Sequence, residues 1–449
     1  MSTGIDYTYR YAYASSLDTV DNGSALSLST SSRKLENPYF FEGKILQPRR
    51  VADMLLVLSE VVRTHFFQPR PPMMDPVLTS SESILRLEGF SGCCGVYVRA
   101  DLPASMFEGD VQGRGTTNVD FNDPMRAALT RLRDKDHVQF SVGKHEVALT
   151  TGEEKVVEKK VKLPIRWIKG FSEVQVYQPG LRLAYEIPSS EALRFMRTLP
   201  KSGAAKRPSY VTQTGKVLRL SQRQKPGSVH LHGTHRIKVI EPLLPKASSL
   251  RIWADDSTGT SAWEVIYDTG SFFLMISPEV YRGFSGEGQL LNILAKGKGQ
   301  DLLSFIQAKL NWQPRINAHE LAGELNTTPA KIESALAILG TRGLAGYDVS
   351  QGAYFHRELP FDHSLVEKLQ PRLKNARKLL EEKKIKIHKK LDADRIDLLV
   401  AGTGVEHLVR LRPEDDRCSC PWFSKYQGER GTCKHILASR LFVEQHVKA

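Results

Sequence analysis

The sequence predicts an α+β protein of several domains. The spacing of apolar residues is strand-like from about residue 80 to about residue 290 and becomes helical from about residue 300. Three of the five cysteines gather near the C-terminus, which is typical of a small metal-binding module. A chain of 449 residues is long enough for roughly three domains, each with its own core. We therefore expect a β-rich N-terminal region, a helical unit and a C-terminal metal module.

The composition favours an acidic partner. The formal net charge of +13 points to nucleic acid first. No apolar run approaches the ~18 residues of a membrane span, so we expect no membrane partner. The N-terminal stretch contains Asp6 and no uninterrupted apolar core, which argues against a secretory signal. Five cysteines are too few, and odd in number, for a disulfide framework, so we expect a reducing cytoplasm.

The first 295 residues divide into an arm and two β-rich units. Residues 1–45 are rich in Ser, Thr and Tyr without a period, and we expect a flexible arm. Two later stretches each give an amphipathic helix, a strand, a Gly-containing turn and another strand: NDPMRAALTRLRDKDHVQFSVGKHEVALTTG and SSEALRFMRTLPKSGAAKRPSYVTQTGKVLRLSQ. This repeated order resembles the unit of sliding-clamp proteins. The resemblance implies one clamp-like unit at residues 46–175 and a second at residues 176–295.

Residues 296–360 predict two helices joined by a turn, with a hairpin behind them. Thr328 can cap the second helix, with Pro329 at its first position. The stretch GLAGYDVSQGAYFHREL then has the pattern of two strands around a turn. The whole resembles a winged helix–turn–helix. If the second helix reads a major groove, Lys331 and Arg342 contact DNA; if the unit serves packing or a partner protein, they do not.

Residues 361–394 form a charged helix or linker. The run KNARKLLEEKKIKIHKK contains five lysines that we single out: Lys383, Lys384, Lys386, Lys389 and Lys390. Two interpretations remain open, a stripe that contacts phosphates and a solvated helix face.

Residues 395–449 contain the cysteine cluster, CSCPWFSKYQGERGTCKHILA. It offers four ligands in the order Cys-x-Cys, twelve residues, Cys-x-His: Cys418, Cys420, Cys433 and His435. Zn²⁺ prefers four such sulfur and nitrogen donors, and a site closed by four protein ligands is structural. An iron–sulfur cluster usually takes four thiolates, and three merely buried cysteines would not need the histidine. The spacing therefore predicts one structural Zn²⁺ with no open position for catalysis.

This spacing resembles the SWIM-type zinc finger. CSCPWF and GTCKHILA carry the likeness, and LLVAG and HLVRLR fit the strands that lead into it. The resemblance implies zinc binding, with DNA or protein interaction as its use. FSGCCGVYVRADL and GTTNVDF extend the likeness to a bacterial family of SWIM zinc finger proteins. That family is encoded with an AAA+ ATPase of the MoxR type and a von Willebrand factor A-domain protein, which the resemblance implies as partners.

Together these features predict a zinc protein that is not an enzyme and that binds nucleic acid, DNA in the first place. The alternative is an adaptor that uses the same modules to link an ATPase to a client protein. Motifs of catalysis are incomplete: GDVQGRGTTNVDF lacks the ending of a phosphate loop, and HELAG lacks the second histidine of a zinc protease. In HLHGTH, His230 and His232 fit a metal site, and they equally fit the outer face of a half-solvated strand.

Overall fold

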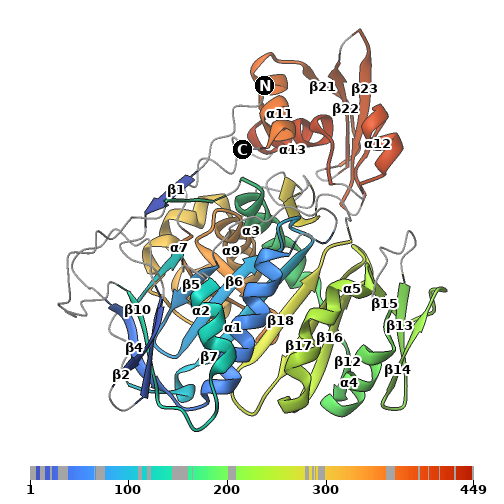
Figure 1. Cartoon of the computed structure of the whole chain (residues 1–449). Helices are drawn as coiled ribbons and strands as arrows, with labels where there is room; N and C mark the ends of the chain where they lie inside the picture. Colours follow the sequence, from blue (N-terminus) through green and yellow to red (C-terminus); the bar gives the residue numbers. More distant parts are fainter. Residues whose placement is uncertain are drawn as a thin grey trace.

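The computed structural model shows a large body of sheets and helices with a smaller C-terminal module above it (Figure 1). It describes the chain apart from residues 1–6, 11–15, 21–22, 29–38, 65, 67–75, 110–113, 119–122, 144–159, 164, 201–208, 279–282, 286–287, 289, 292–298, 360–369, 393–394, 403, 414, 429–430 and 447–449.

An eight-stranded antiparallel sheet forms the centre of the body. From one edge to the other its strands are β12 (Arg182–Pro188), β16 (Ser249–Asp255), β17 (Thr260–Ile266), β18 (Ser271–Ile276), β7 (Val96–Pro103), β6 (Ile84–Phe90), β5 (Val77–Ser80) and β9 (Gly115–Asn118). Strands β18 and β7 pair along their full length and join the two halves. The β-rich units expected at residues 46–175 and 176–295 therefore share one continuous sheet.

One face of this sheet is apolar, and helices cover it. Leu87 of β6 and Val98 of β7 are fully buried on this face. Helix α1 (Pro48–Arg63) packs against β6 and β7, and it confirms the helix that the apolar spacing of this stretch predicts. Helix α4 (Ser189–Thr198) packs against β12 and β16 in the other half of the sheet.

The opposite face carries charged residues that are also buried. Arg86 and Glu88 lie on β6 beside Asp101 and Arg99 of β7, and all four have at most 5% of their surface exposed. Burial of charges is costly unless each charge is paired and hydrogen-bonded. This face therefore needs a covering element that supplies partners.

A helical unit supplies that cover. Its elements are α7 (Leu303–Lys309), α8 (Ala318–Glu324), α9 (Pro329–Thr341), β19 (Ala345–Asp348) and β20 (Ala353–His356). Arg86 Nη2 donates to Asp348 Oδ2 at 2.7 Å, and Arg99 Nη1 donates to the carbonyl of Tyr347 at 2.9 Å. Arg357, which follows β20, donates to Glu88. The hairpin β19–β20 is thus fixed to the sheet by fully buried ion pairs.

The local sequence explains where the two helices of the expected helix–turn–helix begin. The side chain of Asn317 accepts hydrogen bonds from the backbone N–H groups of His319 and Glu320 at the start of α8. The Thr328 side chain accepts from Lys331 N at 3.4 Å, and Pro329 is the first residue of α9. The predicted cap and the predicted helix start are confirmed.

The smaller sheets surround the central one. A five-stranded sheet runs in the order β2 (Ser16–Val20), β3 (Gly23–Leu28), β10 (Val138–Gly143), β4 (Tyr39–Ile45) and β8 (Phe107–Glu108). The other two sheets consist of β1 (Tyr7–Arg10) with β11 (Lys160–Leu163), and of β14 (Val217–Ser221), β13 (Ser209–Thr214) and β15 (Val229–Leu231). Strands β1 to β4 fall in residues 1–45, where we expect a flexible arm.

The remaining helices of the body are α2 (Asp123–Arg131), α3 (Ile165–Tyr177) and α5 (Thr234–Ile237), with 3₁₀ turns at Ala104–Met106, Gln178–Gly180, Lys238–Lys246, Gly283–Ser285 and Gln300–Leu302. Helix α3 packs against α9 of the helical unit. Of the helices in the described part of the chain, none is long and apolar enough to cross a membrane.

The expected repeat is visible in one copy. Helix α4 is followed by the hairpin of β13 and β14, which turns at Gly215 with φ +61°. In the other copy α2 leads to β10, but the strand expected after it falls in residues 144–159, outside the described residues. A strand-for-strand match of the two copies therefore stays a prediction.

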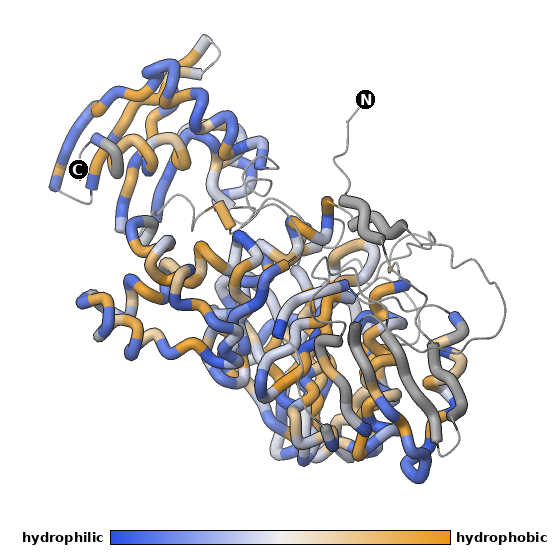
Figure 2. The backbone as a smooth tube through the Cα atoms, turned by 90° about the vertical axis from the view of Figure 1, so that its left-hand side faces the viewer, coloured by the Kyte–Doolittle hydropathy of each residue, from blue (hydrophilic) through white to orange (hydrophobic). Residues whose placement is uncertain are grey.

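The C-terminal module is a four-stranded sheet with helices on one face. The strands are, in order, β21 (Ile385–Lys390), β22 (Ile396–Ala401), β23 (Glu406–Leu411) and β24 (Arg417–Cys418), and the helices are α11 (Pro371–Glu381), α12 (Pro421–Tyr426) and α13 (Lys434–His446). Helices α11 and α13 pack against each other, and α13 packs against all four strands. Hydrophobic and hydrophilic residues are mixed in this module (Figure 2), and more and less buried residues alternate along β22. The segment that we expect as a charged helix or linker thus supplies α11 and β21.

Candidate metal centre

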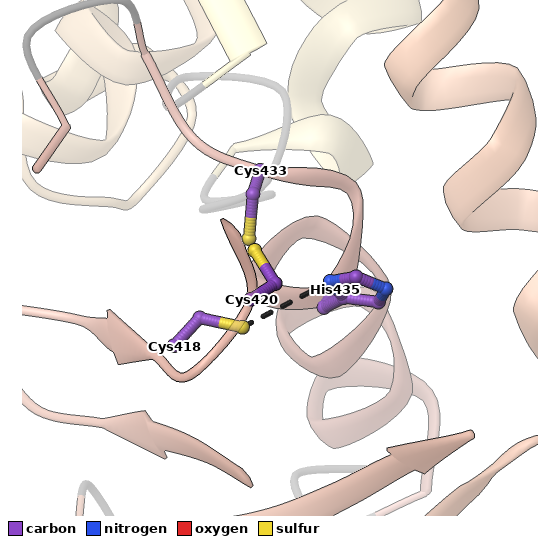
Figure 3. Close-up of side chains that lie close together, drawn as sticks. All are labelled: Cys418, Cys420, Cys433 and His435. Atoms are coloured by element: carbon purple, nitrogen blue, oxygen red, sulfur yellow. Dashed lines mark hydrogen bonds between the residues drawn. The ribbon is translucent and has the colours of Figure 1, made fainter. Parts of the chain in front are cut away.

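The four predicted ligands come from three neighbouring elements of the C-terminal module. Cys418 ends β24, and Cys420 lies two residues later as the N-cap of α12. Cys433 precedes α13, and His435 lies in the first turn of that helix. Their side chains point towards one another (Figure 3). The strand pairing of β23 with β24 and the packing of α13 on the sheet hold the two halves of the site together.

The distances fit a tetrahedral metal ion. The ligand atoms of the four residues all lie within 4.8 Å of one another, and Cys418 Sγ is 3.9 Å from His435 Nδ1. Zinc–sulfur and zinc–nitrogen bonds of ordinary length place tetrahedral ligands about 3.5–3.8 Å apart. The 3.9 Å pair is close to this value, and the 4.8 Å limit on the other pairs is about 1 Å above it.

The chemistry of the donors also fits Zn²⁺. All four residues are buried, with at most 6% of their surface exposed. Within the described chain, Nε2 of His435 is buried without a hydrogen-bond partner. The backbone N–H of Phe423 donates to Cys420 Sγ at 3.4 Å, and that of Ile436 donates to Cys433 Sγ at 3.5 Å, as expected for thiolates. The residues fit a structural Zn²⁺ with four protein ligands.

Proximity couples the three thiols. The hydrogen bond with Cys418 is the main cause that lowers the pKa of Cys420, and the hydrogen bond with Cys433 is the second. Cys420 therefore forms a thiolate most readily. The hydrogen bond with Cys420 is the main cause that raises the pKa of Cys418, and the hydrogen bond with Cys433 adds to it. Zn²⁺ must therefore displace protons from the other thiols when it binds, and zinc affinity rises with pH.

Residues outside the ligand set close the site. The guanidinium of Arg372 on α11 lies over the ring of Trp422, 4.7 Å from its centroid, and Arg372 Nη1 donates to the carbonyl of Thr432 at 2.9 Å. The ring of His407 on β23 lies 4.4 Å from that of His435. Helix α11 therefore belongs to the metal module and packs against the loop that carries Cys433.

Comparison with known proteins identifies this module. The family model of the SWIM zinc finger matches residues 407–439. These residues form a SWIM zinc finger domain. The SWIM match and the cluster of Cys418, Cys420, Cys433 and His435 coincide, and together they support the predicted structural zinc ion. No curated protein matches the chain.

Two solved structures resemble about half of the chain. Proliferating cellular nuclear antigen from Entamoeba histolytica is 8% identical, with a TM-score of 0.34, and the match covers 54% of this chain and 100% of that one. The PCNA2–PCNA3 complex from Sulfolobus tokodaii is 12% identical, with a TM-score of 0.34, over 53% and 99% of the two chains. The chain thus has sliding-clamp structural neighbours, at scores too low to carry an argument.

The five lysines of the charged segment lie at one edge of the sheet of the C-terminal module, residues 370–449, which we call the SWIM module. Lys383 and Lys384 form the turn after α11, and the other three lie on β21. All five are exposed, and Lys384 Nζ is 2.7 Å from Glu382 Oε2. β21 and β24 are the two edge strands of this small sheet. The lysines and the zinc ligands therefore lie at opposite edges of it.

The two residues expected to read a groove lie at opposite ends of α9. Lys331 pairs with Asp301 at 2.6 Å, and Arg342 caps the C-terminal end of the helix. Every residue between Ala335 and Thr341 is buried, and a Cβ on Gly340 would lie 3.3 Å from Gln175 of α3. A helix packed in this way has little surface to place in a major groove. The geometry favours the packing interpretation, and groove reading stays a prediction.

Two features escaped the sequence interpretation. Residues 192–240 contain 11 Lys and Arg and no Asp or Glu, a signal that a count along the chain would have revealed. The buried ion pairs of β6 and β7 give no comparable signal, because alternating charges are also typical of an exposed strand face. The histidines of HLHGTH are not gathered with other ligands: among the residues that the structure describes, the Cys₃His cluster is the one group placed to hold a metal ion.

Proposed function

We propose that this protein is a non-enzymatic zinc protein whose C-terminal module binds nucleic acid, with double-stranded DNA as the first candidate. The zinc ion holds the module together, since four buried protein ligands leave no position for a water or substrate. The observation that carries the proposal is the basic, solvent-exposed face of the sheet opposite the helices.

That face is formed by the outward residues of neighbouring strands. Lys386 of β21 lies opposite Leu399 of β22, and Lys389 lies opposite Asp397. Asp397 in turn lies opposite the exposed Arg410 of β23. Arg412 Nη2 donates to Asp397 Oδ1 at 2.6 Å and neutralises that carboxylate. Lys386, Lys389 and Arg410 thus outnumber the two acids of this outward face, Asp397 and the exposed Glu406, and the face has a net positive charge.

The charge of the module supports the same proposal. Residues 370–449 contain 18 Lys and Arg against 11 Asp and Glu, a formal charge of +7. Neutralisation of phosphates by such side chains releases condensed counterions, which supplies most of the affinity for a nucleic-acid backbone. Contacts of this kind position a protein on nucleic acid without reading its sequence.

A salt series with a labelled DNA duplex tests the proposal. Fluorescence anisotropy should give an association constant that falls with salt by several units on a log–log scale. Absence of salt-sensitive binding at micromolar protein would leave the adaptor as the better account.

The adaptor function rests on a different observation. Phe305 of α7 is 60% exposed, on the helical unit whose α9 is buried against α3. An exposed large aromatic residue is a typical anchor of a protein interface. Candidate partners are the AAA+ ATPase of the MoxR type and the von Willebrand factor A-domain protein. Phe305→Ser should weaken binding of either purified partner, without any change in zinc content, if this function holds.

A further inference from the structure

A second basic surface lies in the body, away from the SWIM module. Residues 192–240 carry a formal charge of +11, since the segment contains no Asp or Glu. The flanking Glu191 and Glu241 pair with Arg194 and Lys238 at the two ends of the segment. Residues 370–449 carry +7, so the rest of the chain is acidic, at −5. The positive charge of this protein is therefore concentrated in two separate segments.

The first segment builds the three-stranded sheet β14–β13–β15, which Figure 1 places at the side of the body remote from the C-terminal module. Leu218 and Val229 are buried and face the core. The residues that alternate with them face outwards. Tyr210 of β13 lies opposite His230 of β15, and Arg219 of β14 is exposed on the same face.

Three rings form a row on this outward face. The centroids of Tyr210 and His230 are 4.9 Å apart, in an edge-on arrangement. His230 and His232 are stacked, with centroids 5.9 Å apart and an interplanar angle of 14°. Burial, followed by the charges of His230 and Arg236, lowers the pKa of His232 to about 4, so this imidazole is neutral at physiological pH. His232 thus adds a neutral ring to the row rather than a further charge.

Exposed cations border the rings. Arg223 and Lys225 lie in the loop from β14 to β15, and both are exposed. Gln224 Nε2 is 3.4 Å from His230 Nε2, which places that loop beside the rings. A hollow of about 370 Å³ adjoins Lys225, and Asp256 is the acidic residue that lines it. Cations next to accessible rings make up the combination that single-stranded nucleic acid uses, because its phosphates need charge and its unpaired bases need a flat surface.

We propose that this face, the ring surface, binds single-stranded nucleic acid, with phosphates at Arg219, Arg223 and Lys225 and bases against Tyr210 and His230. A duplex would use the cations alone, since its bases are stacked inside. The ring surface is separate from the β21 lysines, so it goes beyond the function proposed above and does not depend on it.

The full-length zinc protein and two labelled probes test the proposal: oligo-dT of about 20 nucleotides, longer than the stretch that one such surface covers, and a duplex of equal length. The charge variant is R219E/R223E/K225E. The ring variant is Y210L/H230L, whose fold is checked by its melting temperature. The matched control is R131E/R133E/K135E, which makes the same change of charge at three exposed cations, the last residue of α2 and two in the turn behind it.

The charge variant should bind oligo-dT at least about tenfold more weakly than the control, with a salt slope lower by about 2. The ring variant should lose about tenfold for oligo-dT and little for the duplex. Wild-type affinity of the charge variant for oligo-dT would overturn the proposal even if the β21 lysines prove to bind duplex. Equal losses for both probes with no effect of the ring variant would overturn it in favour of a duplex surface. Competition by poly-glutamate as strong as by oligo-dT would overturn it in favour of an acidic protein.

Discussion

Gly431, in the loop that leads to the zinc ligand Cys433, lies directly against the main chain of Gly288 in the body. A Cβ on Gly431 would fall 2.0 Å from the carbonyl oxygen of Gly288, and Gly431 has a φ of +73°. Gly288 is itself fixed, because its N–H donates to Glu173 Oε1 of α3 at 2.9 Å. The zinc loop and the central body are therefore joined by a contact that only glycine permits.

Gly431→Val should separate the SWIM module from the body without loss of zinc. The new side chain would meet the Gly288 backbone, while the four ligands are untouched. We expect normal zinc content, a larger radius of gyration by small-angle scattering and faster proteolysis between body and module. Gly428→Val is the matched control, since Gly428 also has a positive φ, +89°, but nothing within 4 Å of its Cβ position. Equal behaviour of the two variants would show that the contact does not hold the module in place.

Cys433→Ser should abolish zinc binding and unfold the SWIM module. Much of the folding free energy of such a module comes from the metal, on the order of 10 kcal/mol. Elemental analysis should fall from about one zinc per chain, the content that four closed ligands imply, to none. The body should retain a cooperative melt, because its central sheet and the helices that cover it bury many apolar side chains outside the module. Full zinc content in this variant would contradict the ligand assignment.

Glu88→Gln should loosen the helical unit from the sheet. The change leaves the guanidinium of Arg357, which is fully buried, without its carboxylate. Removal of one partner from a buried ion pair costs about 3–5 kcal/mol. Urea titration of both variants gives the two losses of stability. Lys309→Ala, which breaks the exposed pair with Glu324, should cost at most about 1 kcal/mol. Similar midpoints for the two variants would mean that the buried pair does not fix the unit.

Acid should release the helical unit. Burial alone would raise the pKa of Asp348, but the charges of Arg99 and Arg86 hold it below its ordinary value of 3.8. A carboxylate with a depressed pKa stabilises the fold above its unfolded pKa, and this stability is lost as the pH falls through the folded pKa. Hydrogen exchange of β19 and β20 should therefore rise sharply below about pH 4, the unfolded pKa of an aspartate. Asp348→Asn should remove much of that pH dependence, and an unchanged profile would contradict this account.

Glu264 should act in the opposite direction. Its burial raises its pKa, although a hydrogen bond from Ser350 opposes the effect. A carboxyl group whose folded pKa is raised gives stability in its protonated form, which is lost as the pH rises through the folded pKa. Glu264→Gln, which keeps a hydrogen-bonding side chain without the charge, should therefore increase the free energy of unfolding at pH 7. A decrease there would show that the ionised form is stabilised in the fold.

The sequence predicts most accurately where chemistry depends on spacing. The spacing alone pairs Cys418 with Cys420 and Cys433 with His435, because metal geometry demands two close pairs of ligands. The cap at Thr328 follows equally from local rules for helix starts. Long-range packing has no such local signal. Nothing in the pattern of α9 indicates that Gly340 packs on α3, and the apolar spacing of residues 385–390 does not show which sheet they join.

The central claim is that the basic face of the SWIM module binds a nucleic-acid backbone, and K386E/K389E/R410E, which changes three exposed cations of that face, tests it most directly. Glutamates still place charge on the edge strand, so they keep the protection against strand pairing that lysines give there. The variant should keep the oligomeric state of the wild type and bind a DNA duplex more weakly than R131E/R133E/K135E, with a salt slope lower by about 3. Duplex affinity and salt slope equal to those of that control would contradict the claim.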